Sequence, residues 1–192
     1  MRAETACPAS LGQRGRSSAA VRGITGPKTV YVVRVLMTKL FWEDFAVGQV
    51  NEYGRQPVSA EDIKAFAAEF DPQPMHLDEE AARATIVGGL CASGWHTCAI
   101  MMRIIADGFV LNSSSMGAPG VEEIRWLAPV RPGDVLRVRV TVVDKKASQS
   151  RPLLGFVGLF FEVLNEVGTC VMTSRTNMMF ARRISAHAGA SA

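Results

Sequence analysis

The feature that most constrains the fold is a long apolar segment at residues 95–109, near the middle of the 192-residue chain. Apolar residues recur there at helical spacing and also fill the other faces, which leaves His96, Arg103 and Asp107 as a narrow polar stripe. A helix that is apolar almost all round is buried by other elements. The polar residues interrupt the run, which is therefore too short for a membrane span. We expect a buried helix, an Arg103–Asp107 pair on its polar stripe, and no membrane partner.

The segments around this helix read mostly as strands. After it, residues 121–127, 136–142, 153–163 and 169–180 are expected strands, and alternation of apolar with polar residues is clearest from Leu136 to Val142. Before it, a short strand is expected at 49–56, followed by helices at 59–70 and 78–84. Ser59 is the expected cap of the first of these helices. A buried helix followed by consecutive antiparallel strands predicts an α+β domain whose sheet curls round the helix.

The ends of the chain differ from this central part. Residues 1–36 carry six basic side chains against one acidic, a net charge of +5, so the formal charge of +3 leaves −2 for residues 37–192. The basic character therefore belongs to the N-terminal extension, and a nucleic-acid partner is not expected for the folded part. The extension is expected to be a disordered segment, an organelle transit peptide, or sequence translated from upstream of a true start at Met37. A further strand near the end of the extension is also an open alternative. We predict one domain at 37–184 and a flexible tail at 185–192.

The cysteines indicate a reducing compartment. None of the four, Cys7, Cys91, Cys98 and Cys170, forms a Cys-x-x-Cys pair, and one lies in the basic extension. This usage fits reduced thiols better than a disulfide framework, so a cytoplasmic location is expected.

A proline-braced loop before the helix carries a candidate proton-transfer pair. Asp71 and His76 lie five residues apart, and Pro72 and Pro74 between them stiffen the backbone. The buried helix begins near Gly94, and the N–H groups of a first helical turn lack partners within the helix. Such donors, with the helix dipole behind them, stabilise a developing negative charge. We interpret the two stretches as a proton-transfer site that faces an oxyanion.

Two motifs at this spacing resemble the MaoC-like dehydratase family, which includes (R)-specific enoyl-CoA hydratases. They are Asp71-Pro72-Gln73-Pro74-Met75-His76 and Ala92-Ser93-Gly94-Trp95-His96, and the similarity spans roughly residues 40–180. The first family motif reads Asp, any residue, Asn, Pro, any residue, His, so Gln73 stands at its Asn position. Ser93-Gly94 stands where many relatives have His-Gly. The resemblance implies the hotdog fold, an antiparallel sheet wrapped around a long central helix.

The resemblance also implies an activity, the reversible addition of water to a 2-enoyl-CoA thioester to give a 3-hydroxyacyl-CoA. It implies that Asp71 and His76 deprotonate the water and return a proton to the α-carbon, while the Gly94 N–H donates to the thioester oxygen. The residues expected to bind substrate are Pro74, Ser93 and Trp95. No metal and no bound cofactor are expected, because coenzyme A arrives as part of the substrate.

Other interpretations remain open on the sequence alone. A hotdog thioesterase would bind the same ligand and release free thiol, and a non-catalytic acyl-CoA-binding or subunit-pairing module is mildly favoured by Gln73. Without a catalytic role, Asp71 would form a helix cap or an Asx turn and His76 would be a core histidine. His96 is expected to be structural and hydrogen-bonded along the polar stripe. Ser93 or Cys91 as a nucleophile, and a metal site from Asp71, His76 and His96, lack recognised spacing.

The predicted sheet has implications for assembly. A single sheet leaves strand edges and an open face, and natural proteins usually pair or cover such edges. We therefore expect at least a homodimer, with acyl-CoA bound near the subunit interface.

Overall fold

The computed structural model describes residues 39–183, so the predicted N-terminal extension and C-terminal tail lie outside the described residues. The helices and strands follow in this order: η1 Trp42–Asp44, β1 Val50–Pro57, α1 Ala60–Phe70, α2 Pro74–Leu77, α3 Glu79–Arg83, α4 Gly94–Ile105, the π-helical η2 Ala106–Val110, β2 Val121–Trp126, β3 Val135–Ala147, β4 Leu154–Leu164 and β5 Cys170–Ala181. No helix between residues 39 and 183 has the length and apolar character needed to cross a membrane.

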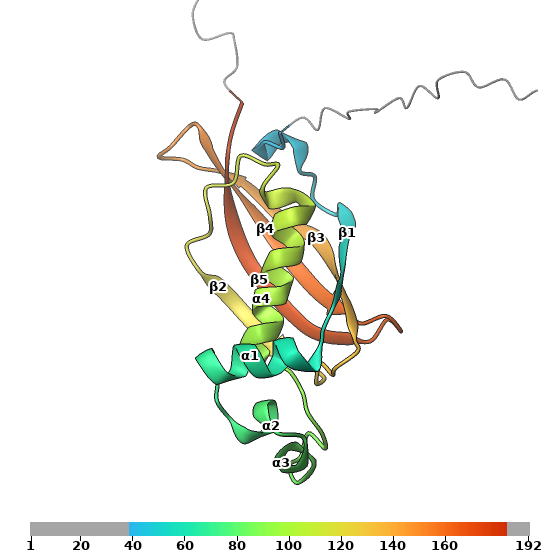
Figure 1. Cartoon of the computed structure of the whole chain (residues 1–192). Coiled ribbons are helices and arrows are strands. Elements are labelled where there is room, and N and C mark those ends of the chain that lie inside the picture. Colours follow the sequence, from blue (N-terminus) through green and yellow to red (C-terminus); the bar gives the residue numbers. More distant parts are fainter. Residues whose placement is uncertain (1–38, 184–192) are drawn as a thin grey trace, which may run out of the picture. The chain divides into compact units, whose positions relative to one another are not determined.

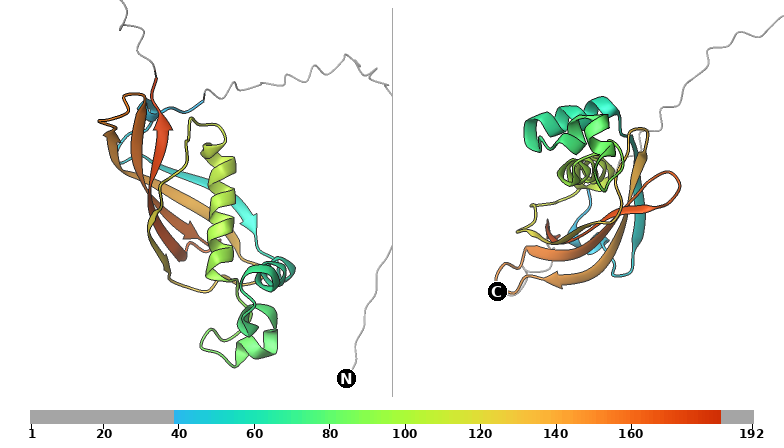
Figure 2. Two further views of the ribbon diagram at one scale, coloured as in Figure 1. Left: turned by 90° about the vertical axis from the view of Figure 1, so that its left-hand side faces the viewer. Right: turned by 90° about the horizontal axis from the view of Figure 1, so that it is seen from below.

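Five antiparallel strands form one sheet in the order β1-β3-β4-β5-β2. The sheet curls round α4 (Figure 1; Figure 2, right), which confirms the predicted hotdog fold. Its inner face follows from the alternation of the sequence, because Leu136, Val138, Val140 and Val142 are all buried. The two edge strands of the sheet are β1 and β2.

The core lies between α4 and the inner face of the sheet. Ile100, Ile104 and Ile105 of α4 are at most 9% exposed and join one apolar cluster with buried side chains of β3, β4 and β5. Strand β1 approaches the helix closely at Gly54, where an added Cβ would lie 2.5 Å from Ile104. Burying apolar side chains in this way contributes about 1.5–3 kcal/mol each, so α4 and the sheet stabilise one another.

The expectation that α4 is buried is confirmed for only part of its apolar surface. Trp95 and Met102 are 58% and 45% exposed, because the sheet covers one side of the helix and leaves a strip uncovered. Arg103 and Asp107 form the predicted pair, with Nε and Oδ2 2.8 Å apart. His96 was expected to form hydrogen bonds along the polar stripe, but it is only 8% exposed and stacks on Phe66 at a centroid distance of 4.6 Å. Its Nδ1 has no hydrogen-bond partner among the described residues.

The segment α1–α3 packs at the end of the molecule where α4 begins (Figure 1; Figure 2, left). Ser59 caps α1 as predicted, because its Oγ accepts a hydrogen bond from the Asp62 N–H at 3.0 Å. The single turn α2 was not predicted; Pro74 occupies its first position, where the missing N–H has no intrahelical partner to lose. This segment brings the loop with Asp71 and His76 to the N-terminus of α4.

Candidate active site

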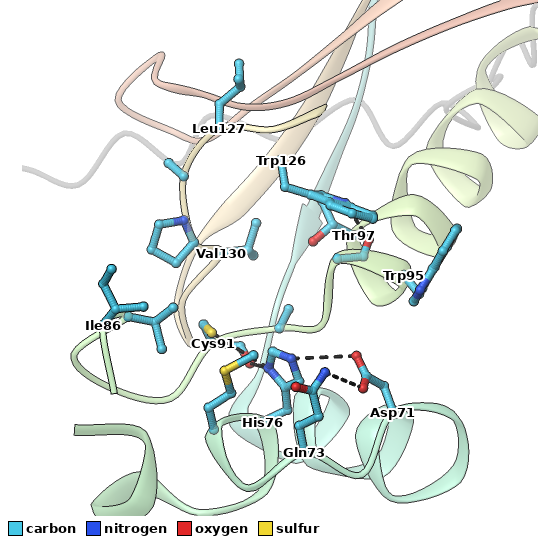
Figure 3. Close-up of a pocket in the computed structure, with 16 residues that line it drawn as sticks. Asp71, Gln73, His76, Ile86, Cys91, Trp95, Thr97, Trp126, Leu127 and Val130 are labelled. Atoms are coloured by element: carbon cyan, nitrogen blue, oxygen red, sulfur yellow. Dashed lines mark hydrogen bonds and ion pairs between the residues drawn. The ribbon is translucent and has the colours of Figure 1, made fainter. Parts of the chain in front are cut away.

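Three stretches that are separate in the sequence meet at the start of α4. Asp71 is the residue that ends α1, His76 lies in the short α2, and Ser93 and Gly94 begin α4. Figure 3 shows Asp71, Gln73 and His76 grouped at one end of a pocket. The helical turn α2 moves His76 back towards the end of α1, so two side chains five residues apart face each other.

His76 is held in one orientation by the main chain. The residue is 4% exposed, and its Nδ1 lies 2.8 Å from the carbonyl oxygen of Cys91. A carbonyl oxygen only accepts hydrogen bonds, so Nδ1 carries the proton and Nε2 presents a lone pair when the ring is neutral. Nε2 points at Asp71, 3.6 Å from Oδ2. That separation is too long for a direct hydrogen bond and leaves both atoms able to accept from one water molecule.

Each oxygen of the Asp71 carboxylate has its own donor. The Ser93 hydroxyl donates to Oδ2 at 2.6 Å, and the Gln73 side-chain amide donates to Oδ1 at 2.8 Å. These hydrogen bonds, that of Ser93 first, lower the pKa of Asp71 below its usual value, and a charge on His76 acts in the same direction. The carboxylate is therefore ionised at neutral pH and is fixed from two sides.

Gly94 is the third group of the site, after Asp71 and His76, and contributes a backbone N–H. It is the first residue of α4, and its N–H takes part in none of the hydrogen bonds found among the described residues. The Trp126 ring covers this glycine: its Nε1 donates to the Gly94 carbonyl at 3.0 Å, and an added Cβ would lie 2.4 Å from the ring. Only glycine allows this approach, so a free N–H at the helix N-terminus is kept beside the Asp71–His76 pair.

These groups border a pocket of about 740 Å³, a volume within the usual range for small-molecule sites. Its polar end contains Asp71, Gln73 and His76. The rest is largely apolar, with side chains from the loop before α4, from α4 itself, from the last residue of β2 and from the connection after it: Ile86, Val87, Ala92, Trp95, Trp126, Leu127, Ala128, Pro129 and Val130. The arrangement suits a ligand with one polar reacting centre and an apolar body.

The segment 86–90, whose first two residues line the pocket, is held by Arg131. Its guanidinium donates to the carbonyl oxygens of Gly89 and Leu90, at 2.6 and 3.2 Å, and to that of Val87. Leu90 leads directly into Cys91, whose carbonyl orients His76. Arg131 therefore links the β2–β3 connection to the loop before α4.

The structure brings together Asp71, His76 and Gly94, and Trp95 also lines the pocket. Pro74 and Ser93, predicted to bind substrate, are not among the lining residues; Ser93 is fully buried behind Asp71. His96 faces a different hollow, beside Phe66 and Phe70. Burial raises the pKa of the Cys91 thiol, which opposes the thiolate that a nucleophile needs.

Sequence reasoning missed the contributions of the Cys91 carbonyl, Trp126 and Arg131. Nothing in their local patterns indicated a role, since each reaches the site through tertiary packing. Gln73 was the exception, because its place inside the first motif already connected it with Asp71. Within residues 39–183, no cluster of three or more His, Cys, Asp or Glu side chains has the arrangement of a metal site.

Comparison with known proteins places the chain in a family. The family model of the MaoC like domain matches residues 44–154. The MaoC-like dehydratase from Rhodospirillum rubrum, a solved structure, is 45% identical, with a TM-score of 0.70, over 76% of this chain and 99% of that one. The uncharacterized protein YdeM of Bacillus subtilis is 33% identical over 73% of this chain and 98% of its own length. A 3-hydroxybutyryl-CoA dehydratase of Methylorubrum extorquens is 29% identical over 55% of this chain and 65% of its own length.

The family match covers more than half of the chain and includes both the Asp71–His76 loop and the start of α4. The relatives and the fold agree with it. This chain belongs to the MaoC-like dehydratase family.

Proposed function

We propose that this protein, as a hydratase/dehydratase of its family, adds water reversibly to a 2-enoyl-CoA thioester to give a 3-hydroxyacyl-CoA. The observation that carries the proposal is the facing pair of Asp71 Oδ2 and His76 Nε2, 3.6 Å apart, at the end of an apolar pocket. A carboxylate oxygen and an imidazole nitrogen at this separation are able to hold one water molecule between them. The acyl group would occupy the apolar part of the pocket.

The proposed chemistry follows from the positions of these groups. The water oxygen bonds to the β-carbon while one of its protons passes to the Asp71–His76 pair. The electron pair of the double bond moves towards the thioester carbonyl, whose oxygen gains negative charge. The Gly94 N–H donates to that oxygen, and a proton returned by the pair to the α-carbon completes the addition.

Support for a coenzyme A thioester comes from the relative in Methylorubrum extorquens, whose name states that it acts on 3-hydroxybutyryl-CoA. On this proposal no bound cofactor is required, since coenzyme A enters with the substrate. We also propose a cytoplasmic location, for which the free thiols of Cys91, Cys98 and Cys170 are the support.

We further propose that the protein is a homodimer. Strand β2 lies at an edge of the sheet, and exposed apolar side chains gather on it and on the neighbouring strip of α4: Trp95, Met102, Val121, Trp126 and Leu127. A second copy pairing with this edge would cover both the free strand and the apolar side chains. Trp95 and Trp126 also line the pocket, so acyl-CoA would bind near the subunit interface.

The test of the activity is the loss of enoyl-thioester absorbance when the protein is added to crotonyl-CoA, with free thiol measured in parallel. We expect the wild type to remove the band without releasing thiol. Asp71→Asn and His76→Gln should each lose about 10²–10⁴-fold in rate, the usual contribution of general acid–base catalysis, while remaining folded. Asp107→Asn is the matched control, because that carboxylate pairs with Arg103 on the surface of the molecule.

Three other results would contradict the proposal. Release of thiol by the wild type would identify a thioesterase. Substantial hydration by Asp71→Asn or His76→Gln would remove the pair from the mechanism. Stabilisation of the fold by acyl-CoA thioesters of several chain lengths, with turnover of none, would indicate a binding module.

A further inference from the structure

Gln73 is the position at which the first motif departs from the family pattern, and the structure connects its side chain directly with Asp71. Gln73 precedes α2 in extended conformation, and its backbone N–H donates to the Asp71 carbonyl at 2.7 Å. The side chain then turns back, and Nε2 donates to Oδ1 of the same aspartate at 2.8 Å (Figure 3). Residue 73 is therefore bound to Asp71 through both its main chain and its side chain.

The two oxygens of the carboxylate are held by different parts of the chain. Gln73 holds Oδ1 from the loop after α1, and Ser93 holds Oδ2 from the start of α4. A carboxylate with one donor would still be free to rotate about its Cβ–Cγ bond. With a donor on each oxygen its plane is fixed, and Oδ2 faces His76 Nε2.

We propose that Gln73 is a positioning residue for the Asp71–His76 pair, whose side-chain amide fixes the orientation of the Asp71 carboxylate. The kinetic part of this inference rests on the proposed hydratase function. On this view Gln73 supports catalysis, whereas from the sequence it mildly favoured a non-catalytic protein.

The same hydrogen bond affects the charge of Asp71. Among the neighbours that shift the pKa of Asp71, only His76 is titratable, whereas Gln73 and Ser93 are neutral donors that favour the ionised carboxylate. Loss of the Gln73 donor therefore raises the pKa of Asp71. The acid limb of the pH–rate profile, below which Asp71 becomes protonated, then moves to higher pH.

Two variants separate the hydrogen bond from the shape of the side chain. Gln73→Met keeps the length of the side chain and removes the donor, while Gln73→Glu replaces the donor with a second negative charge beside Asp71. The control is Gln149→Met, an exposed glutamine in the β3–β4 connection. We expect the acid limb of kcat/KM to lie lowest in the wild type and the control, higher in Gln73→Met and highest in Gln73→Glu. In Gln73→Met kcat should fall about ten-fold with a smaller change in KM, as for the loss of one hydrogen bond to a charged group.

A second measurement does not depend on turnover. The carboxyl ¹³C resonance of Asp71, assigned by its absence in Asp71→Asn, is titrated by NMR in the wild type and in both Gln73 variants. The inference predicts the same order of Asp71 pKa values as the order of the acid limbs. If that order is found but no thioester is hydrated, the proposed function fails and the role of Gln73 stands.

Unchanged Asp71 titration in both variants would overturn the inference. So would an unchanged pH–rate profile and kcat in an active protein, and the proposed function would then remain intact.

Discussion

Ser93 joins the start of α4 to the Asp71 carboxylate through a single hydroxyl group. Its Oγ accepts a hydrogen bond from the Trp95 N–H at 3.2 Å and donates to Asp71 Oδ2 at 2.6 Å. The residue is fully buried, so no water replaces either partner in the folded state. The cap of the helix and the orientation of Asp71 therefore depend on the same atom.

Replacing Ser93 by alanine is expected to destabilise the protein in a pH-dependent way. At pH 7 the loss should be about 2 kcal/mol, from a helix cap and a hydrogen bond to a charged group. Because the pKa of Asp71 is lowered in the folded protein, its ionised form stabilises the fold above the unfolded-state pKa, and this stabilisation is lost as pH falls through the folded-state pKa. Urea unfolding at several pH values should show the difference between wild type and Ser93→Ala shrinking on acidification below about pH 4. A difference that is constant from neutral to acidic pH would contradict the assigned hydrogen bond.

At the level of single residues, the motif predicted only part of the site. The Asp71–His76 spacing predicted a pair, because a rigid loop holds two side chains at a fixed separation. The partners of the pair were not predictable in the same way. The Cys91 carbonyl and the Ser93 hydroxyl become neighbours only after α1–α3 folds against the start of α4, and their hydrogen bonds depend on that packing.

At the level of elements, the connection between β2 and β3 supports the site, although neither Asp71 nor His76 lies in it. Arg131 begins the turn, and its backbone N–H donates to Asp134 Oδ2 at 2.7 Å. Its side chain reaches the carbonyls of the segment 87–90, and the Val130 carbonyl accepts from the Ala92 N–H at 2.9 Å. The turn and the loop before α4 therefore form one unit.

We expect Arg131→Met to loosen this unit without removing the Asp71–His76 pair. Loss of the guanidinium leaves backbone carbonyls without a donor, at a cost of about 1–3 kcal/mol. Hydrogen exchange should accelerate in residues 86–91, and KM should rise more than kcat falls, because the segment forms a wall of the pocket. Arg151→Met, at an exposed arginine in the β3–β4 connection, is the control. Protection of residues 86–91 equal to that of the wild type would show that Arg131 does not hold the loop.

The strands were predictable as elements because one face of an antiparallel sheet is buried, and the resulting period of two is visible in the sequence. Two short elements, η1 and α2, were missed because a single turn is too short for a periodicity to appear. The exposure of one strip of α4 was also missed. Composition predicts that an apolar helix will be covered, but it does not tell which part of the molecule provides the cover.

For the molecule as a whole, the uncovered strip of α4 and the free edge of β2 together indicate how two copies could assemble. Trp126 on β2 lies edge-on to Trp95 of α4 at a centroid distance of 5.6 Å, and both are about half exposed. These apolar side chains stand at the mouth of the candidate active site. Dimerisation over this surface would therefore shield the site from water as well as stabilise the fold.

The predicted homodimer is testable by mass in solution. Light scattering at micromolar concentration should give about twice the chain mass of 20.7 kDa. Val121→Lys places a charge on the free edge strand and is expected to shift the protein towards the monomer. Val167→Lys, in the β4–β5 turn, is the matched control at another exposed valine. A monomeric wild type, or equal masses for all three proteins, would contradict the proposed interface.

The sequence alone determined the class of fold, the order of the main elements and the residues of the candidate proton-transfer pair. These follow from local patterns: the apolar helix, the alternating strands, and a motif whose prolines fix the backbone between Asp71 and His76. Only the tertiary structure decided which groups orient that pair, that Gln73 and Ser93 each hold one oxygen of Asp71, and which face of α4 stays open. The physical reason is that hydrogen-bond partners and burial depend on the distances between segments far apart in the chain, which local patterns do not contain.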